Sequence, residues 1–129
     1  MTVDRAIDAA DSLLPGTPTP FHNTDPRWQA IIAVAEYIDS NPDEIWQFVH
    51  KWGGHPQEDL RNAIACCLLE HMLDYHFESI FPRVRSAVNA NRLFADMFCR
   101  CWKFGQSDTP DNSQQFDKLK DWCREHWGV

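Results

Sequence analysis

Four side chains that could do chemistry lie close together within residues 59–77, a stretch whose apolar spacing predicts a helix. Cys67, His71 and Asp74 follow at i, i+4 and i+7, so they share one face of that helix. Glu70 lies beside them. A thiol, an imidazole and a carboxylate are the groups of a thiol hydrolase, and the same side chains could serve as metal ligands. The strip therefore defines one hypothesis, a small metal-dependent or thiol enzyme.

The same strip has a simpler interpretation, which we favour. An activated cysteine usually sits at a helix N-terminus, where the helix dipole promotes the thiolate, whereas Cys67 lies in mid-helix. The chain has no HExxH motif. Glu70 and Asp74 are then the solvent-exposed edge of a buried helix. Either His71 or Arg61 would pair with them, and the chain would have no catalytic residue, no metal and no cofactor.

A second group of candidates is basic and aromatic. Arg92, Arg100 and Lys103 form a stripe along residues 91–104, with Trp102 close by. Such a combination can grip phosphates and stack on bases. The net charge of −7, however, opposes binding to nucleic acid and to anionic membranes. We therefore interpret the stripe as a solvated helix face that pairs with the acidic N-terminal half.

Acidic residues and off-core tryptophans together suggest a protein interface. Residues 1–80 carry four basic and 13 acidic side chains, whereas residues 81–129 carry eight and six. Clustered acid steers a basic partner, and exposed aromatic side chains are frequent hot spots. The predicted binding residues are Glu36, Asp39, Asp43, Glu44, Trp46, His50, Trp102 and Trp122.

Composition narrows the class of protein further. A chain of 129 residues with 43% hydrophobic residues and five glycines predicts one compact domain. No P-loop, GxGxxG, GxSxG or EF-hand motif is present. The five cysteines lack the spacing of a disulfide framework or a zinc site. Without a signal-peptide pattern or an apolar run of about 20 residues, we expect reduced thiols and a cytoplasmic location.

The elements that must position these residues are all predicted to be helical. We expect the Asn41 side chain to cap one helix, with Glu44 completing a capping box. The predicted helices span residues 3–14, 26–40, 42–52, 57–76, 82–89, 91–104 and 113–127, with a Pro-rich arm at 15–24 and a turn at 77–81. Residues 1–129 form a single helical domain, in which residues 1–24 are an N-terminal helix plus arm and residues 25–129 a body of paired helices.

Helix lengths and short connections suggest antiparallel pairs of roughly 30–37 residues each. The predicted pairs are 26–39 with 42–52, 57–76 with 82–89, and 91–104 with 113–127. Over residues 26–127 this pattern resembles the HEAT family of α-hairpin repeats, and the resemblance implies a scaffold whose concave face binds another macromolecule. An irregular bundle of six or seven helices fits the same pattern.

The favoured prediction is an all-α, non-enzymatic protein-binding module with another protein, of basic character, as its partner. A small acidic chain without a catalytic motif would suit an inhibitor, such as a bacterial immunity protein that masks a basic toxin. A homodimer that uses Trp102 and Trp122 is a further hypothesis. We expect neither a membrane nor nucleic acid as a partner.

Overall fold

The computed structural model describes residues 1–129 without the side chain of His22, and over these residues it is entirely helical. The all-α prediction is confirmed. The elements are α1 (Val3–Leu13), η1 (His22–Thr24), α2 (Pro26–Ala35), α3 (Pro42–Trp52), α4 (Glu58–Ile64), η2 (Ala65–Leu69), α5 (Glu70–Tyr75), α6 (Phe77–Ala90), α7 (Arg92–Cys99), η3 (Gly105–Asp108) and α8 (Pro110–Trp127).

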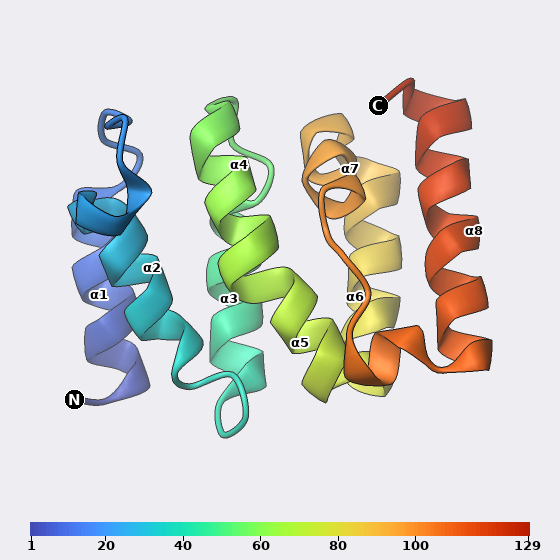
Figure 1. The fold of residues 1–129 in the computed structure, drawn as a ribbon, viewed down its shortest axis with the longest axis horizontal. Helices are drawn as coiled ribbons and strands as arrows, with labels where there is room; N and C mark the ends of the chain where they lie inside the picture. The colour runs from blue at the N-terminus through green and yellow to red at the C-terminus, as the bar shows by residue number, and fades with distance from the viewer.

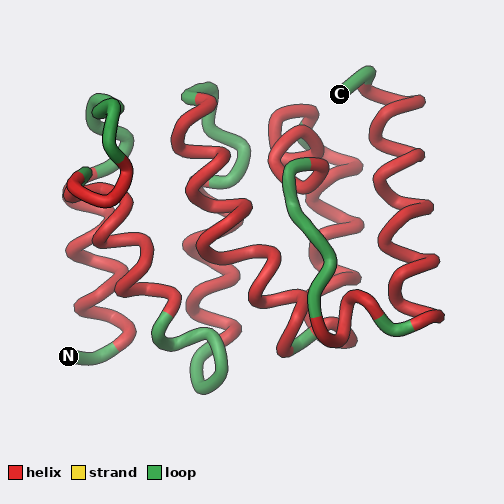
Figure 2. The backbone as a smooth tube through the Cα atoms, viewed as in Figure 1, coloured by secondary structure: helices red, strands yellow, loops and turns green.

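The helices form antiparallel hairpins in two layers (Figure 1; Figure 2). α2, the continuous α4–η2–α5 helix and α7 lie toward the viewer, α1, α3 and α6 lie behind them, and α8 closes one end. The closest packing joins α1 to α2 and α6 to α7. The predicted pairing of residues 26–39 with 42–52 is therefore wrong, because α2 packs against α1. The predicted contact between the last two helices is present, since α7 packs against α8.

Side-chain caps mark the starts of three helices, α1, α2 and α7. Thr2 caps α1, and the Asp25 Oδ1 accepts a hydrogen bond of 2.9 Å from the backbone N–H of Arg27 at the start of α2. α3 begins at Pro42 as predicted, but the predicted capping box is wrong. The Asn41 side chain makes no cap bond and accepts from the Ser40 hydroxyl instead.

A π-helical turn, η2, interrupts the central helix. The amide N–H of Glu70 donates to the carbonyl of Ala65, five residues earlier instead of four. The extra residue rotates everything after it by roughly one position around the helix. Glu70 therefore turns inward, with 6% of its surface exposed, and Tyr75 turns outward, with 54% exposed. The predicted solvent edge is wrong at Glu70. The apolar spacing of the helix would also bury Tyr75, which is instead exposed.

α6 runs without a break from Phe77 to Ala90 although it contains Pro82. The predicted turn at 77–81 followed by a new helix is wrong. Proline lacks the N–H that would bond to the carbonyl four residues earlier, here that of Glu78. Both Pro82 and Glu78 are exposed, so water can satisfy that carbonyl and the helix tolerates the proline.

Two other helices end earlier than predicted. α2 ends at Ala35, and residues 36–40 form turns. α7 ends at Cys99, and residues 101–104 lead without helical structure to η3. This segment descends beside α5 in Figure 1, and η3 packs against α5.

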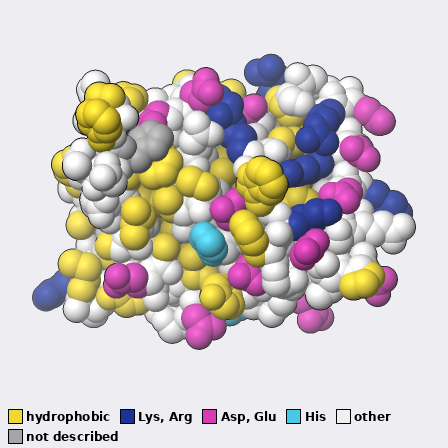
Figure 3. Space-filling view, viewed as in Figure 1, with side chains coloured by type: hydrophobic (Ala, Val, Ile, Leu, Met, Phe, Trp, Pro, Cys, Tyr) yellow, Lys and Arg dark blue, Asp and Glu magenta, His cyan; other side chains and the backbone are white. Residues whose placement is uncertain are grey.

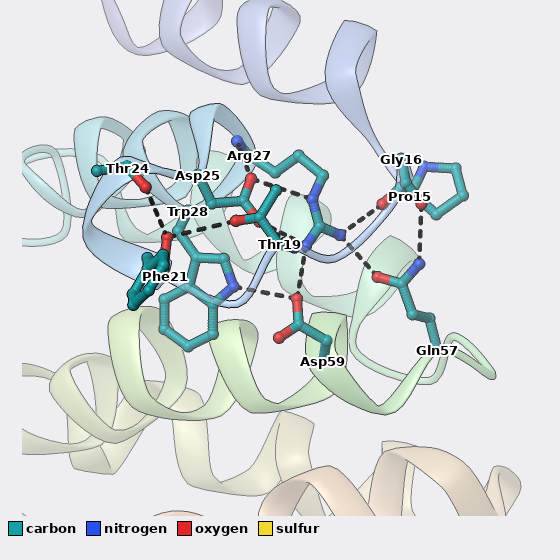
Figure 4. Close-up of polar contacts among 10 residues, drawn as sticks. All are labelled: Pro15, Gly16, Thr19, Phe21, Thr24, Asp25, Arg27, Trp28, Gln57 and Asp59. Carbon is teal, nitrogen blue, oxygen red and sulfur yellow. Dashed lines mark hydrogen bonds and ion pairs between the residues drawn. The ribbon is translucent and has the colours of Figure 1, made fainter.

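A buried guanidinium holds the Pro-rich arm on α4 (Figure 4). Arg27 is 5% exposed, and its Nη2 forms ion pairs with Asp25 at 2.8 Å and with Asp59 at 2.6 Å. Its Nη1 donates to the Pro15 carbonyl and to the Gln57 side-chain oxygen, both at 2.7 Å. The course of the arm is thus fixed by contacts with residues more than ten positions away.

Candidate functional site

An open groove lies between α2 and the middle of the central helix. α2 packs against η2, and the turns that follow Ala35 form one wall while α5 continues the other. The groove has a volume of about 550 Å³. We call it the α2–α5 groove, and its lining residues are Ile32, Ala35, Glu36, Ile38, Asp39, Cys66, Cys67, His71 and Tyr75.

Large apolar side chains are exposed in this groove and next to it. Within it, Ile32 is 44% exposed and Tyr75 54%. Phe104 stacks on the groove residue His71, with ring centroids 6.1 Å apart, and Trp102 on the same segment is 74% exposed. In Figure 3, hydrophobic side chains gather over α2 and the central helix, whereas Lys and Arg gather over α7 and α8. Apolar patches of this kind mark interaction sites.

Two carboxylates stand on the α2 side of the groove. Glu36 and Asp39 line it and make no ion pair within the part of the chain that the structure describes. The other predicted acidic residues lie elsewhere. Asp43 pairs with Arg83 at 2.8 Å, and Glu44 lines a separate hollow between α1 and α3. The structure therefore divides the predicted acidic set and leaves two of its members at the groove.

Two adjacent thiols belong to the opposite wall. The Sγ atoms of Cys66 and Cys67 are 3.9 Å apart. The hydrogen bond between them lowers the pKa of Cys66, and the same interaction together with burial raises the pKa of Cys67. Cys66 is also the exposed member of the pair. Cys66 is therefore the more accessible thiol, and the raised pKa of Cys67 makes it poorly suited to the predicted role of nucleophile.

The other members of the predicted catalytic strip have separate partners. The Glu70 carboxylate accepts a hydrogen bond of 2.9 Å from the backbone N–H of Trp102, and burial raises its pKa. Asp74 lies against Gly105 in the segment that leads to η3. Among the described residues, no three His, Cys, Asp or Glu side chains are grouped so that they could hold a metal ion. The four residues of the strip therefore do not form a triad or a metal site.

Basic residues beside the central helix are engaged in ion pairs. Arg61, one of the two partners predicted for the strip, instead lies 3.0 Å from Asp96. Arg100 pairs with the same aspartate at 3.0 Å and with Glu58 at 3.3 Å. The expected pairing of the basic stripe with the acidic half is confirmed at Arg100.

The remaining predicted contact residues occupy other faces. Trp46 and His50 line a hollow between α3 and α6, and the Trp46 ring lies 5.9 Å from that of the buried Phe94. Trp122 lies on α8, stacked on His126 at 4.6 Å. The eight predicted binding residues therefore do not form one site.

The apolar residues of the groove were missed by the sequence analysis. Ile32 and Tyr75 both match the apolar spacing of their helices, so the pattern predicts them to be buried. The π-helical turn brings Tyr75 to the surface. The residue types of the helix do not predict where such a turn occurs. No sequence signal identifies this pair.

Comparison with known proteins gives no relative: no protein-family model, curated protein or solved structure matches the chain. Among the described residues, none of the helices has both the length and the apolar character needed to cross a membrane. The function must therefore be argued from the groove itself.

Proposed function

We propose that this chain is a non-enzymatic protein-binding module, and that the α2–α5 groove takes a segment of another protein in which an apolar side chain is flanked by basic ones. The observation that carries the proposal is the position of Glu36 and Asp39. Both carboxylates line the groove without an ion pair in the described part of the chain, and the large exposed residues of the groove are apolar.

The apolar wall would supply most of the binding energy. Tyr75 and Ile32 are large side chains that are about half exposed in the free chain. Complete burial of an exposed side chain of this size contributes roughly 1.5–3 kcal/mol, so covering the exposed half contributes about half of that. Aromatic residues are also frequent hot spots. Trp102 and Phe104 extend the exposed apolar surface on the segment that follows α7.

The carboxylates would select the partner and accelerate encounter. A lysine or arginine of the partner could reach Glu36 or Asp39 without first breaking an ion pair within the described chain. Complementary charge of this kind raises association rates and disfavours acidic competitors. The net charge of −7 also attracts a basic partner and repels an acidic one.

An inhibitor or immunity-type protein, which masks a basic partner, is the role we propose for such a surface. The resemblance to HEAT-type arrays stays a prediction, and the stacking of antiparallel hairpins supports it. In an array of that kind, the helices of one layer offer a continuous face to a partner.

Selection of displayed peptides on the purified chain tests the proposal. We expect the enriched peptides to combine Lys or Arg with a central large apolar residue. Enrichment of acidic peptides would contradict the proposal. So would equal enrichment on a variant that carries Glu36→Gln, Asp39→Asn and Tyr75→Ala.

Matched variants locate the binding of a selected peptide. Tyr75→Ala should weaken the affinity roughly 30-fold, which corresponds to a hot-spot loss of about 2 kcal/mol. Glu36→Gln with Asp39→Asn should weaken binding and flatten its salt dependence. Glu44→Gln removes the same kind of charge away from the groove, so it should leave both quantities unchanged.

Two other functions have less support. The thiol form of the enzyme hypothesis requires Cys67 as an activated nucleophile, and its raised pKa argues against that. The metal-dependent form requires a group of ligands, and the described residues contain no group of three that could hold a metal ion. A homodimer through Trp102 and Trp122 stays a prediction, and light scattering tests it. A dimer that dissociates on Trp102→Ala would support that alternative.

A further inference from the structure

Two neighbouring cysteines bring their sulfur atoms together on one wall of the α2–α5 groove. Cys66 and Cys67 belong to η2, the π-helical turn, and both line the groove. Their Sγ atoms are 3.9 Å apart. Successive side chains of an α-helix diverge by about 100°, and the wider π-helical turn reduces that divergence. The backbone of η2 therefore holds two thiols within reach of one bound atom.

Both thiols are accessible from the groove. Cys66 is exposed, and Cys67 is partly exposed. The hydrogen bond between them lowers the pKa of Cys66, and the same contact together with burial raises the pKa of Cys67. As chain neighbours, the two residues have Cα atoms about 3.8 Å apart, below the usual range of about 4.4–6.8 Å for a disulfide. The pair is therefore suited to remain two thiols.

The sulfur separation fits the binding of a single atom by both thiols. Two thiolates that bind one tetrahedral metal ion at about 2.3 Å lie about 3.8 Å apart, close to the observed 3.9 Å. Such an ion takes further ligands, and among the described residues no third His, Cys, Asp or Glu side chain is grouped with the pair for that purpose. Trivalent arsenic that already carries one carbon substituent needs only two sulfur ligands. The two thiols match that chemistry.

The groove offers apolar surface to an organic substituent beside the thiols. It has a volume of about 550 Å³, and Ile32 and Ala35 line its α2 side. Ile32 is 44% exposed, and α2 packs against η2, which carries both cysteines. Tyr75 follows Cys67 by eight residues, which corresponds to about 12 Å of helix rise. A ring attached close to the sulfurs would therefore contact α2 and not Tyr75.

We propose that Cys66 and Cys67 form a dithiol site for a trivalent arsenical that carries an aromatic substituent. Both sulfurs bind the arsenic atom, and the aromatic ring lies on the α2 side of the groove at Ile32. The site shares the groove with the proposed partner segment, but its chemistry does not depend on that partner.

The reaction needs no oxidant or reductant. Phenylarsine oxide is present in water as its dihydroxy form, in which arsenic carries the phenyl group and two hydroxyl groups. Each thiol forms one As–S bond while one As–O bond breaks, and the thiol proton leaves with the hydroxyl group as water. Two waters are released in total, and both arsenic and sulfur keep their oxidation states.

Binding of phenylarsine oxide to the reduced chain tests the proposal. We expect calorimetry to give one equivalent bound. Alkylation followed by peptide mass spectrometry should show that Cys66 and Cys67 are protected, whereas the partly exposed Cys99 stays reactive. The methyl analogue should bind roughly tenfold more weakly, because it covers less apolar surface. Undiminished alkylation of Cys66 and Cys67, or equal affinity for the two arsenicals, would overturn the proposal.

Single variants locate the site. Cys66→Ser and Cys67→Ser should each lower the affinity roughly 100-fold or more, because a single thiol loses the effective concentration of the pair. Cys99→Ser is the matched control and should leave the affinity unchanged. Ile32→Ala should reduce the preference for the phenyl over the methyl compound. Full affinity in either groove-cysteine variant would overturn the proposal.

Two features keep this test independent. Protection from alkylation is measured in the unmodified chain, so it does not depend on the folding of any variant. Tyr75→Ala, which should weaken the binding of a selected peptide, should leave arsenical binding unchanged. Because no peptide is used, failure of the dithiol site is distinguishable from failure of the proposed function.

Discussion

The Glu70 carboxylate accepts a hydrogen bond of 2.9 Å from the backbone N–H of Trp102. This bond joins the central helix to the segment that follows α7, and it forms because the π-helical turn directs Glu70 inward. Trp102 itself remains exposed, two residues before the Phe104 ring that stacks on His71. One buried carboxylate thus ties the aromatic flank of the groove to its wall.

Replacing Glu70 with alanine should destabilise the fold by about 1–3 kcal/mol, because the N–H of Trp102 would lose its acceptor. Glu70→Gln keeps an acceptor oxygen and should cost less. Urea unfolding followed by circular dichroism measures both. Glu125→Ala, at an exposed glutamate on α8, is the control and should change stability by less than about 0.5 kcal/mol. A loss for Glu70→Ala no larger than the control would contradict the prediction.

Removing the Arg27 guanidinium should cost about 3–5 kcal/mol, because Asp25 and Asp59 would lose a buried ion-pair partner. We also expect faster proteolysis within residues 15–24, since Arg27 binds the Pro15 carbonyl. Arg27→Ala is compared with Arg5→Ala, at an exposed arginine of α1, by denaturant unfolding and limited proteolysis. Equal stability and equal cleavage of the two variants would show that the network does not hold the arm.

Lowering the pH should reduce the free energy of unfolding, in part because Asp25 becomes protonated. Hydrogen bonds from Arg27 lower the pKa of Asp25 from 3.8 to about 2. A carboxyl with a lowered folded-state pKa stabilises the fold fully above its unfolded value and loses that contribution as pH falls through the folded value. In urea titrations between pH 3.8 and about 2, stability should therefore fall less steeply for Asp25→Asn than for the unmodified chain. If the free energy of unfolding fell with pH at the same slope in both chains, the lowered pKa assigned to Asp25 would be contradicted.

Alanine substitutions at two glycines with positive φ distinguish the cost of backbone strain from the cost of steric overlap. φ is +48° at Gly105 and +71° at Gly128. A Cβ added at Gly128 meets nothing within 4 Å, whereas one added at Gly105 would overlap the Asp74 carboxylate. Gly128→Ala should cost about 1–2 kcal/mol from the left-handed backbone alone, and Gly105→Ala should cost more. Asp74→Ala in the Gly105→Ala chain should recover part of the difference. Equal unfolding free energies for the two glycine variants would refute this interpretation.

The starts of α1, α2 and α3 could be predicted from sequence because their signals are local. Thr2 and Asp25 cap through side chains that reach a backbone N–H within three residues, and Pro42 fits the first helical position wherever it occurs. Helix ends depend more on tertiary contacts. α7 ends at Cys99, and the segment that follows donates a hydrogen bond from Trp102 to Glu70. No residue type near Cys99 predicts that contact.

The groove could be predicted only in part. The sequence identifies Glu36 and Asp39 as acidic residues. It does not show that these two line the groove while Asp43 pairs with Arg83. Tyr75 could not be predicted as exposed, because the π-helical turn changes its face without changing any residue type. Periodicity assumes a constant rotation per residue, and this helix does not have one.

Amide chemical-shift mapping with one selected basic and apolar peptide tests the central claim most directly. We predict shifts concentrated in residues 32–39 and 66–75, with the exposed amides of α8 unaffected, and loss of these shifts in the Tyr75→Ala chain. Shifts that instead centre on Trp46 and His50, or on Trp122, would contradict the assignment of the α2–α5 groove as the binding site.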